Sequence, residues 1–183
     1  MLKINGARLW NSLMEMAKIG ATPEGGVSRV AVSEEDRLGR DLLRSWATPF
    51  VEDYHFDEVG NMFFVRHGQQ PESPVILTGS HLDTQIHGGR FDGAFGVMAG
   101  LEVLRTLAEG EIRLPYGIGL VAWTNEEEAC YCPAMGSAVF VGKQNLRSAL
   151  DCVGLNGKVF REELKKIGYL GRRLELNISA YLA

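Results

Sequence analysis

The segment PVILTGS, residues 74–80, has the continuous apolar run of a buried central strand. Residues 93–109 follow it and place apolar side chains at helical spacing. A second buried strand is predicted at YGIGLVAWT, residues 116–124. Because strands that alternate with helices form α/β sheets, we predict a mixed, mostly parallel sheet with helices on both faces.

Patterns on either side of this unit extend the prediction to the rest of the chain. Ser33 precedes three acidic residues and can cap a helix, since its hydroxyl accepts from a free backbone N–H. The segment Val59-Gly60-Asn61 is typical of a turn between two strands. The expected helices are 4–19, from 33 onward, 133–142 and 158–167, and the expected strands are 50–57, 61–66 and 172–183.

The composition argues against several classes of protein. The chain has 183 residues, of which 45% are hydrophobic and 23% charged, as in an ordinary globular domain. Its net charge of −4 lacks the basic excess of a nucleic-acid binder. The longest uncharged stretch, residues 129–142, is too short to span a membrane, and the first residues lack the apolar core of a secretory signal. We therefore expect a cytoplasmic protein with no nucleic-acid or membrane partner.

The three cysteines support the same location. Cys130, Cys132 and Cys152 are an odd set in a chain too large to need disulfides. The one-residue spacing of Cys130 and Cys132 differs from that of a redox or zinc-binding pair. Small buried thiols are the expected outcome.

Polar residues follow both central strands. His81 and Asp83 come directly after the first strand, Asp92 lies at the start of the next helix, and Glu126 and Glu127 follow the second strand. Each has an ordinary explanation alone: a loop histidine, a turn aspartate, or a solvated run of glutamates. Because sites of α/β sheets lie beyond the carboxyl ends of strands, the joint arrangement favours a metal hydrolase.

Three motifs in fixed order then identify a family resemblance. GSHLDT (79–84), GGRFDG (88–93) and AWTNEE (122–127) closely resemble the N-carbamoyl-L-amino-acid hydrolase, β-ureidopropionase and allantoate amidohydrolase family. The resemblance extends from about residue 4 to residue 182, through the segments WNSLMEMA (10–17), GATPEGG (20–26), PAM (133–135) and GS (136–137). It implies a di-zinc aminopeptidase-like catalytic domain.

The resemblance also implies a role for each motif residue. His81 resembles a ligand of one metal, Asp92 the carboxylate that bridges two metals, and Glu127 a ligand of the second metal. Glu126 resembles the general base and Asp83 the carboxylate partner of His81. Two divalent ions (Zn, or Mn, Co or Ni) would activate a bridging water, and Glu126 would pass its proton to the leaving nitrogen. The substrate implied is the carbamoyl C–N bond of an N-carbamoyl-L-amino acid or similar ureido acid.

The register of the glutamates follows from Asn125, because in the family the base and the ligand directly follow Thr-Asn. Two departures from the family lie behind the base: Glu128 stands where the family usually has Gly, and Cys130 where it usually has Arg. Glu128 is the next candidate for the base if Glu126 is not. His87 is an alternative but disfavoured ligand.

The resemblance further implies that residues 1–183 are the N-terminal part of the catalytic domain. The family's further histidine ligands, its lid and dimerisation domain and the C-terminal part of its catalytic domain are expected to be absent. Full-length relatives are expected to be homodimers, and this fragment to self-associate. Two alternatives stay open: an allantoate amidohydrolase or acyl-amino-acid amidase of the same group, and a truncated, non-catalytic fragment that needs a partner chain.

Overall fold

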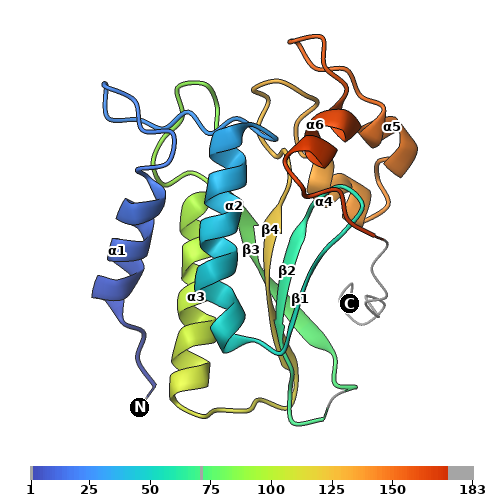
Figure 1. Cartoon of the computed structure of the whole chain (residues 1–183). Helices are drawn as coiled ribbons and strands as arrows, with labels where there is room; N and C mark the ends of the chain where they lie inside the picture. The colour runs from blue at the N-terminus through green and yellow to red at the C-terminus, as the bar shows by residue number, and fades with distance from the viewer. Residues whose placement is uncertain (1, 71, 173–183) are drawn as a thin grey trace.

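The computed structural model describes residues 2–70 and 72–172 (Figure 1). Most of the expected elements are found within them, with shorter bounds. A short helix that the sequence analysis missed, α5, follows Asn145, whose side chain accepts from the Ser148 N–H. The elements in chain order are α1 (Gly6–Met16), α2 (Glu34–Ala47), the 3₁₀ turn η1 (Thr48–Phe50), β1 (Asp53–Phe56), β2 (Met62–Arg66), β3 (Val75–His81), α3 (Ala94–Glu109), β4 (Gly117–Trp123), α4 (Met135–Phe140), α5 (Leu146–Leu150) and α6 (Phe160–Lys166).

The four described strands form one mixed sheet in the order β1-β2-β4-β3. The mixed sheet was predicted, but two of the three described pairings are antiparallel, which corrects the expectation of a mostly parallel sheet. β1 and β2 are joined by a short turn, and such a connection allows only antiparallel pairing. β3 and β4 are joined through α3 and pair in parallel, with His81 opposite Trp123 at their carboxyl ends.

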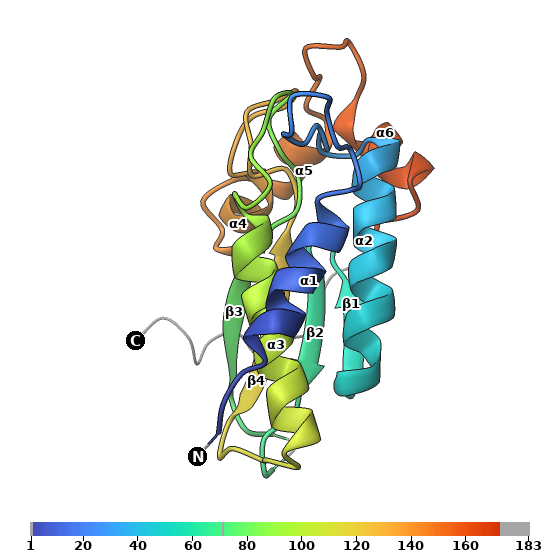
Figure 2. The ribbon, with the colours of Figure 1, turned by 90° about the vertical axis from the view of Figure 1, so that its left-hand side faces the viewer.

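Three helices, α1, α2 and α3, cover one face of the sheet (Figure 2). Met62 and Phe64 of β2 lie in the core on this face with Leu101 of α3. On the opposite face Phe63 contacts the ring of Phe140 in α4, with ring centroids 5.5 Å apart. Helices were expected on both faces of the sheet. On the second face, α4 is the only described helix that confirms this expectation.

β3 differs from its prediction as a buried central strand. In the described sheet it pairs with β4 alone, and Ile76 is 46% exposed. A continuous apolar run shows that a strand can be buried, but not which strands flank it. The strand expected at 172–183 lies outside the described residues, apart from Arg172, which is in no strand.

One buried arginine fastens α1 to the segment that follows β3. The Arg29 guanidinium donates to the carbonyls of Met16 and Ile19 at the end of α1, and to the carbonyl of Leu82. The backbone of Arg29 also exchanges hydrogen bonds with Thr84. Arg29 thus fixes Leu82 and Thr84, the residues on either side of Asp83, by hydrogen bonds. No described helix is both long and apolar enough to cross a membrane.

Candidate metal and catalytic site

The site lies where two parallel strands end. His81 is the last residue of β3, and Glu126 and Glu127 follow Trp123, the last residue of β4. Since β3 and β4 are neighbours in parallel register, both carboxyl ends open at the same edge of the sheet. Asp92 reaches this edge from the loop before α3.

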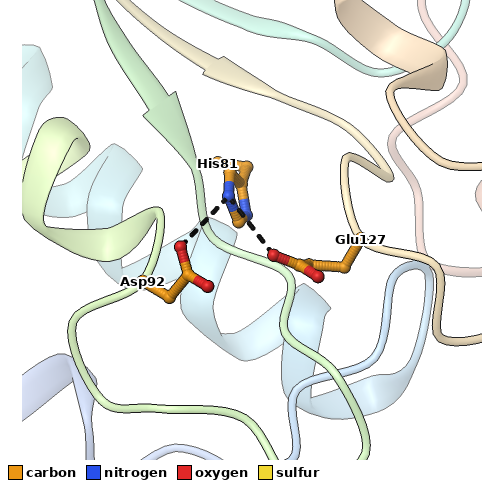
Figure 3. Close-up of side chains that lie close together, drawn as sticks. All are labelled: His81, Asp92 and Glu127. Carbon is orange, nitrogen blue, oxygen red and sulfur yellow. Dashed lines mark ion pairs between the residues drawn. The ribbon is translucent and has the colours of Figure 1, made fainter.

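Three side chains converge there (Figure 3). His81 Nε2 lies 3.7 Å from Glu127 Oε1 and 4.0 Å from Asp92 Oδ1, and one donor atom of each residue lies within 4.8 Å of the others. The side chains of His81 and Glu127 are 13% and 19% exposed, whereas Asp92 is 73% exposed. The structure therefore brings His81, Asp92 and Glu127 together, while their role as metal ligands stays a prediction.

Asp83 orients His81, but through its backbone. His81 Nδ1 lies within hydrogen-bond distance of the Asp83 carbonyl oxygen, at 2.9 Å, and farther from the expected partner, carboxylate Oδ1, at 3.9 Å. Because a carbonyl only accepts, Nδ1 carries the proton in the neutral ring. Nε2 then presents its lone pair to Asp92 and Glu127, as a metal ligand requires.

The Asp83 carboxylate connects the two strand ends. Its Oδ2 accepts from the Glu127 backbone N–H at 3.0 Å, and its side chain is 1% exposed. Burial, and after it the negative charge of Asp36, raise the pKa of the Asp83 carboxyl above its ordinary range. Oδ1 is buried and accepts no hydrogen bond from the residues that the structure describes. Asp83 therefore holds His81 by its backbone and Glu127 by its side chain.

Glu126 points to a different partner from Glu127. Its two carboxylate oxygens accept from the Ser137 backbone N–H and from the Ser137 hydroxyl, both at 2.8 Å. Ser137 belongs to the GS segment of the family resemblance, but the sequence predicts no role for it. It is the third residue of α4, and only the fold brings it to Glu126.

Three hydrogen bonds hold Thr124, which begins the segment that carries Glu126 and Glu127. Its N–H donates to Asn61 Oδ1 and its carbonyl accepts from the Gly136 N–H, both at 2.9 Å. Its hydroxyl accepts from the buried guanidinium of Arg40 at 3.1 Å. Asn125 then takes a left-handed conformation, with φ 55°, that asparagine tolerates better than most residues. This turn sends Glu126 and Glu127 in different directions.

Gly93 allows Asp92 to approach His81. Its φ is +63°, and a Cβ atom there would lie 2.4 Å from Cε1 and Nδ1 of His81. Any side chain would therefore displace the imidazole as well as strain the backbone. The Asp-Gly pair reads as an ordinary turn in the sequence, and only the fold shows that the histidine ring occupies this space.

One imidazole nitrogen and two carboxylates suit a divalent metal ion. The exposed side of Asp92 leaves room for an ion, and the tautomer set by Asp83 frees Nε2. In residues 2–70 and 72–172 no other group of three or more such side chains lies this close. The disfavoured alternatives His87 and Glu128 are both exposed and lie outside the group.

Residues 61–159 match the family model of peptidase family M28. The chain therefore belongs to peptidase family M28. Within it, the chain is similar to the N-carbamoyl-L-amino-acid amidohydrolases, as the motifs predicted. The relative from Rhizobium meliloti is 44% identical over 170 residues, which are 92% of this chain and 41% of the relative.

Other relatives agree with this assignment. A hydantoinase/carbamoylase family amidase from Burkholderia ambifaria superposes with a TM-score of 0.91 at 48% identity, over 94% of this chain and 42% of that chain. The allantoate amidohydrolase of Bacillus subtilis is 39% identical over 94 residues, which are 51% of this chain and 23% of the relative. The chain thus spans about 40% of the length of the carbamoylase relatives that it matches.

Proposed function

We propose that this chain carries part of the site of a metal-dependent amidohydrolase. The observation that carries the proposal is the convergence of His81, Asp92 and Glu127 at the carboxyl ends of β3 and β4. His81, Asp92 and Glu127 would hold divalent metal, with Zn, Mn, Co or Ni as the candidates.

In this mechanism the chain's own residues orient the ligands and move the proton. Bound metal would activate a water molecule and polarise the scissile carbonyl. Glu126 accepts the proton of the attacking water and delivers it to the leaving nitrogen. Ser137 fixes the orientation of the Glu126 carboxylate with two hydrogen bonds, and Asp83 fixes those of His81 and Glu127.

The proposed substrate is a ureido group beside a carboxylate. The names of the relatives support it, because an N-carbamoyl-L-amino acid and allantoate both contain this unit. Hydrolysis of the carbamoyl C–N bond of an N-carbamoyl-L-amino acid releases the amino acid and carbamate, which decomposes to carbon dioxide and ammonia. The similarity to carbamoylases covers more of this chain, so we favour N-carbamoyl-L-amino acids over allantoate.

Two ions need more ligands than the described residues offer. His81, Asp92 and Glu127 supply three donor side chains, whereas two four-coordinate sites need more, even with a bridging carboxylate and water. We therefore propose that the remaining ligands come from further polypeptide, in the same frame or in a partner chain. In the described sheet β3 pairs with β4 alone, and its other edge supports such a partner, because exposed strand edges pair with other strands. The free thiols support a cytoplasmic location.

Metal binding by the purified chain tests the site directly. Titration calorimetry with Zn²⁺ or Mn²⁺ should show weak binding of fewer than two ions per chain, which His81→Ala abolishes. His87→Ala is the matched control and should leave the binding unchanged. Binding that survives His81→Ala and Glu127→Gln would contradict the proposed ligands.

A chimera tests the reaction. The chain would be joined to the part of the Rhizobium meliloti relative that the alignment leaves uncovered, and release of amino acid from N-carbamoyl-L-amino acids would be measured. Glu126→Gln should lower turnover by about a hundredfold or more while metal content is kept. Glu128→Gln should have little effect. Full activity of the Glu126→Gln chimera would reassign the base.

A further inference from the structure

The loop behind Glu127 carries two cysteines that differ from their prediction. Cys132 is exposed and Cys130 and Cys152 are half-buried, so the expectation of three buried thiols is wrong. The reason is that Cys130 and Cys132 lie in the loop of residues 128–133, and Cys152 lies just after the end of α5, instead of within a packed helix or strand. Exposure makes these thiols available for chemistry.

The loop runs directly beside the segment that follows α5. The Leu155 N–H donates to the Cys130 carbonyl at 3.0 Å, and a Cβ atom on Gly154 would lie 2.8 Å from the sulfur of Cys130. Both segments line one pocket of about 230 Å³, and Cys130, Cys132 and Cys152 all contribute to its wall. Three thiols from two distant parts of the chain therefore share one small, open space.

Within this space the thiols of Cys132 and Cys152 come from two segments that line the same pocket. The pKa of the Cys132 thiol is raised above its ordinary value, first by the charge of Cys152 and then by a hydrogen bond between the two thiols. A negative charge on the neighbouring sulfur disfavours a second negative charge on Cys132. A thiolate beside a neutral thiol is the arrangement that disulfide formation uses.

We propose that Cys132 and Cys152 are a redox-active dithiol that a peroxide converts to an intramolecular disulfide. The Cys152 thiol releases its proton and its sulfur attacks one peroxide oxygen. The O–O bond breaks, the leaving hydroxide takes up a proton, and sulfenic acid and one water are formed. The Cys132 sulfur then attacks the sulfenic sulfur, the S–O bond breaks, and a second water leaves with the thiol proton. The peroxide is reduced by two electrons, and the two thiols are oxidised to one disulfide.

The disulfide would fasten the loop that adjoins the proposed base. The Asn125 side-chain amide donates to the Cys132 carbonyl at 2.7 Å, so Cys132 is already connected to the residue before Glu126. Neither the proposed reaction nor the proposed metal site uses these thiols. The dithiol therefore stands independently of the function proposed above.

The test uses the purified chain, reduced and then treated with stoichiometric hydrogen peroxide. Trypsin cleaves at Lys143 and Arg147, so Cys132 and Cys152 fall on separate peptides and a disulfide joins them. Mass spectrometry should find the joined peptides in chains that are not covalently linked to one another. Two thiols per chain should be lost, and a reductant should restore them. Cys130 shares its tryptic peptide with Cys132, so single variants must separate the two.

Cys132→Ser and Cys152→Ser should each abolish the joined peptides, whereas the matched control Cys130→Ser should form them as the wild type does. Circular dichroism checks that the variants are folded. Oxidation in denaturant should lose the preference for Cys132. Joined peptides that persist in Cys132→Ser, disulfides only between chains, or sulfinic and sulfonic acids without a disulfide would each overturn the proposal.

Discussion

The carboxylate of Glu126 is held at both oxygens by one residue, Ser137, whose backbone N–H and hydroxyl each donate at 2.8 Å. The neighbouring Glu127 instead faces His81 across 3.7 Å. Two adjacent glutamates thus have different partners, and each is oriented by a different part of the fold.

Ser137→Ala should lower turnover of the chimera about tenfold or more. Without the hydroxyl, only the Ser137 backbone N–H orients the Glu126 carboxylate, and it bonds one oxygen of the two. The loss should appear in kcat with KM nearly unchanged, since Ser137 acts through Glu126 and not on the substrate. Ser137→Thr keeps the hydroxyl and should restore most of the activity. A change in KM alone would argue that Ser137 binds substrate instead.

Gly93→Ala should weaken metal binding about tenfold or more, because a Cβ atom at this position overlaps the His81 ring. Because alanine disfavours a positive φ, the substitution should also lower the free energy of unfolding by about 1–2 kcal/mol. Gly89→Ala in the same loop is the matched control, since nothing lies within 4 Å of its Cβ position. Calorimetric titration and urea unfolding of both variants give the two quantities. Equal metal affinity of the two variants would contradict the contact with His81.

Arg29→Met should lower the free energy of unfolding by about 3–5 kcal/mol. The substitution leaves three backbone carbonyls without their hydrogen-bond donor, and it removes a positive charge near the carboxylates of Asp36 and Asp83. Burial lowers the pKa of Arg29, but a guanidinium stays charged at any pH at which the chain folds. Arg147→Ala removes an 88% exposed arginine and should change stability by less than about 0.5 kcal/mol. Urea unfolding that cannot tell the two variants apart would refute the role given to Arg29.

Asp57 should make stability depend on pH below neutrality. Burial raises the pKa of its carboxyl to about 6, although it accepts hydrogen bonds from Val59 and from Asn61. The folded chain therefore keeps a proton that the unfolded chain releases near pH 4. Its contribution to the free energy of unfolding is fully present below about pH 4 and is lost as the pH rises through 6, by about 3 kcal/mol at most.

The control for this effect is Asp57→Asn, which cannot titrate. The difference in the free energy of unfolding between wild type and variant should shift in favour of the variant as the pH rises from 4 to 6. Urea unfolding at several pH values measures it. A difference that stays constant over this range would show that the pKa of Asp57 is ordinary.

Self-association is expected through the edge of β3. Sedimentation of the chain should show species larger than a monomer, and Ile76→Lys should reduce them, because a charge in place of an exposed apolar residue on an edge strand opposes pairing. Leu38→Lys, at an exposed apolar residue of α2, is the matched control and should leave the association unchanged. A wild-type chain that stays monomeric would contradict the proposed partner.

The sequence by itself determined the local structure and the chemistry of the site. Apolar spacing located β3, α3 and β4 to within two residues, and Ser33 caps α2 by accepting from the Asp36 N–H, as expected. These signals are local, because helix and strand periods and capping depend on neighbours in the chain. The order of the three motifs also predicted which side chains would gather, since strands that end at one edge of a sheet carry their next residues to one place.

Only the tertiary structure decided how distant segments meet. The two antiparallel pairings, the position of β3 at the edge of the described sheet and the shared pocket of Cys132 and Cys152 depend on packing between segments far apart in the chain. The same holds for Ser137 on Glu126, and for the His81 ring in the space beside Gly93. A sequence pattern records which face of an element is apolar, but the partner of that face is chosen by close packing over the whole domain.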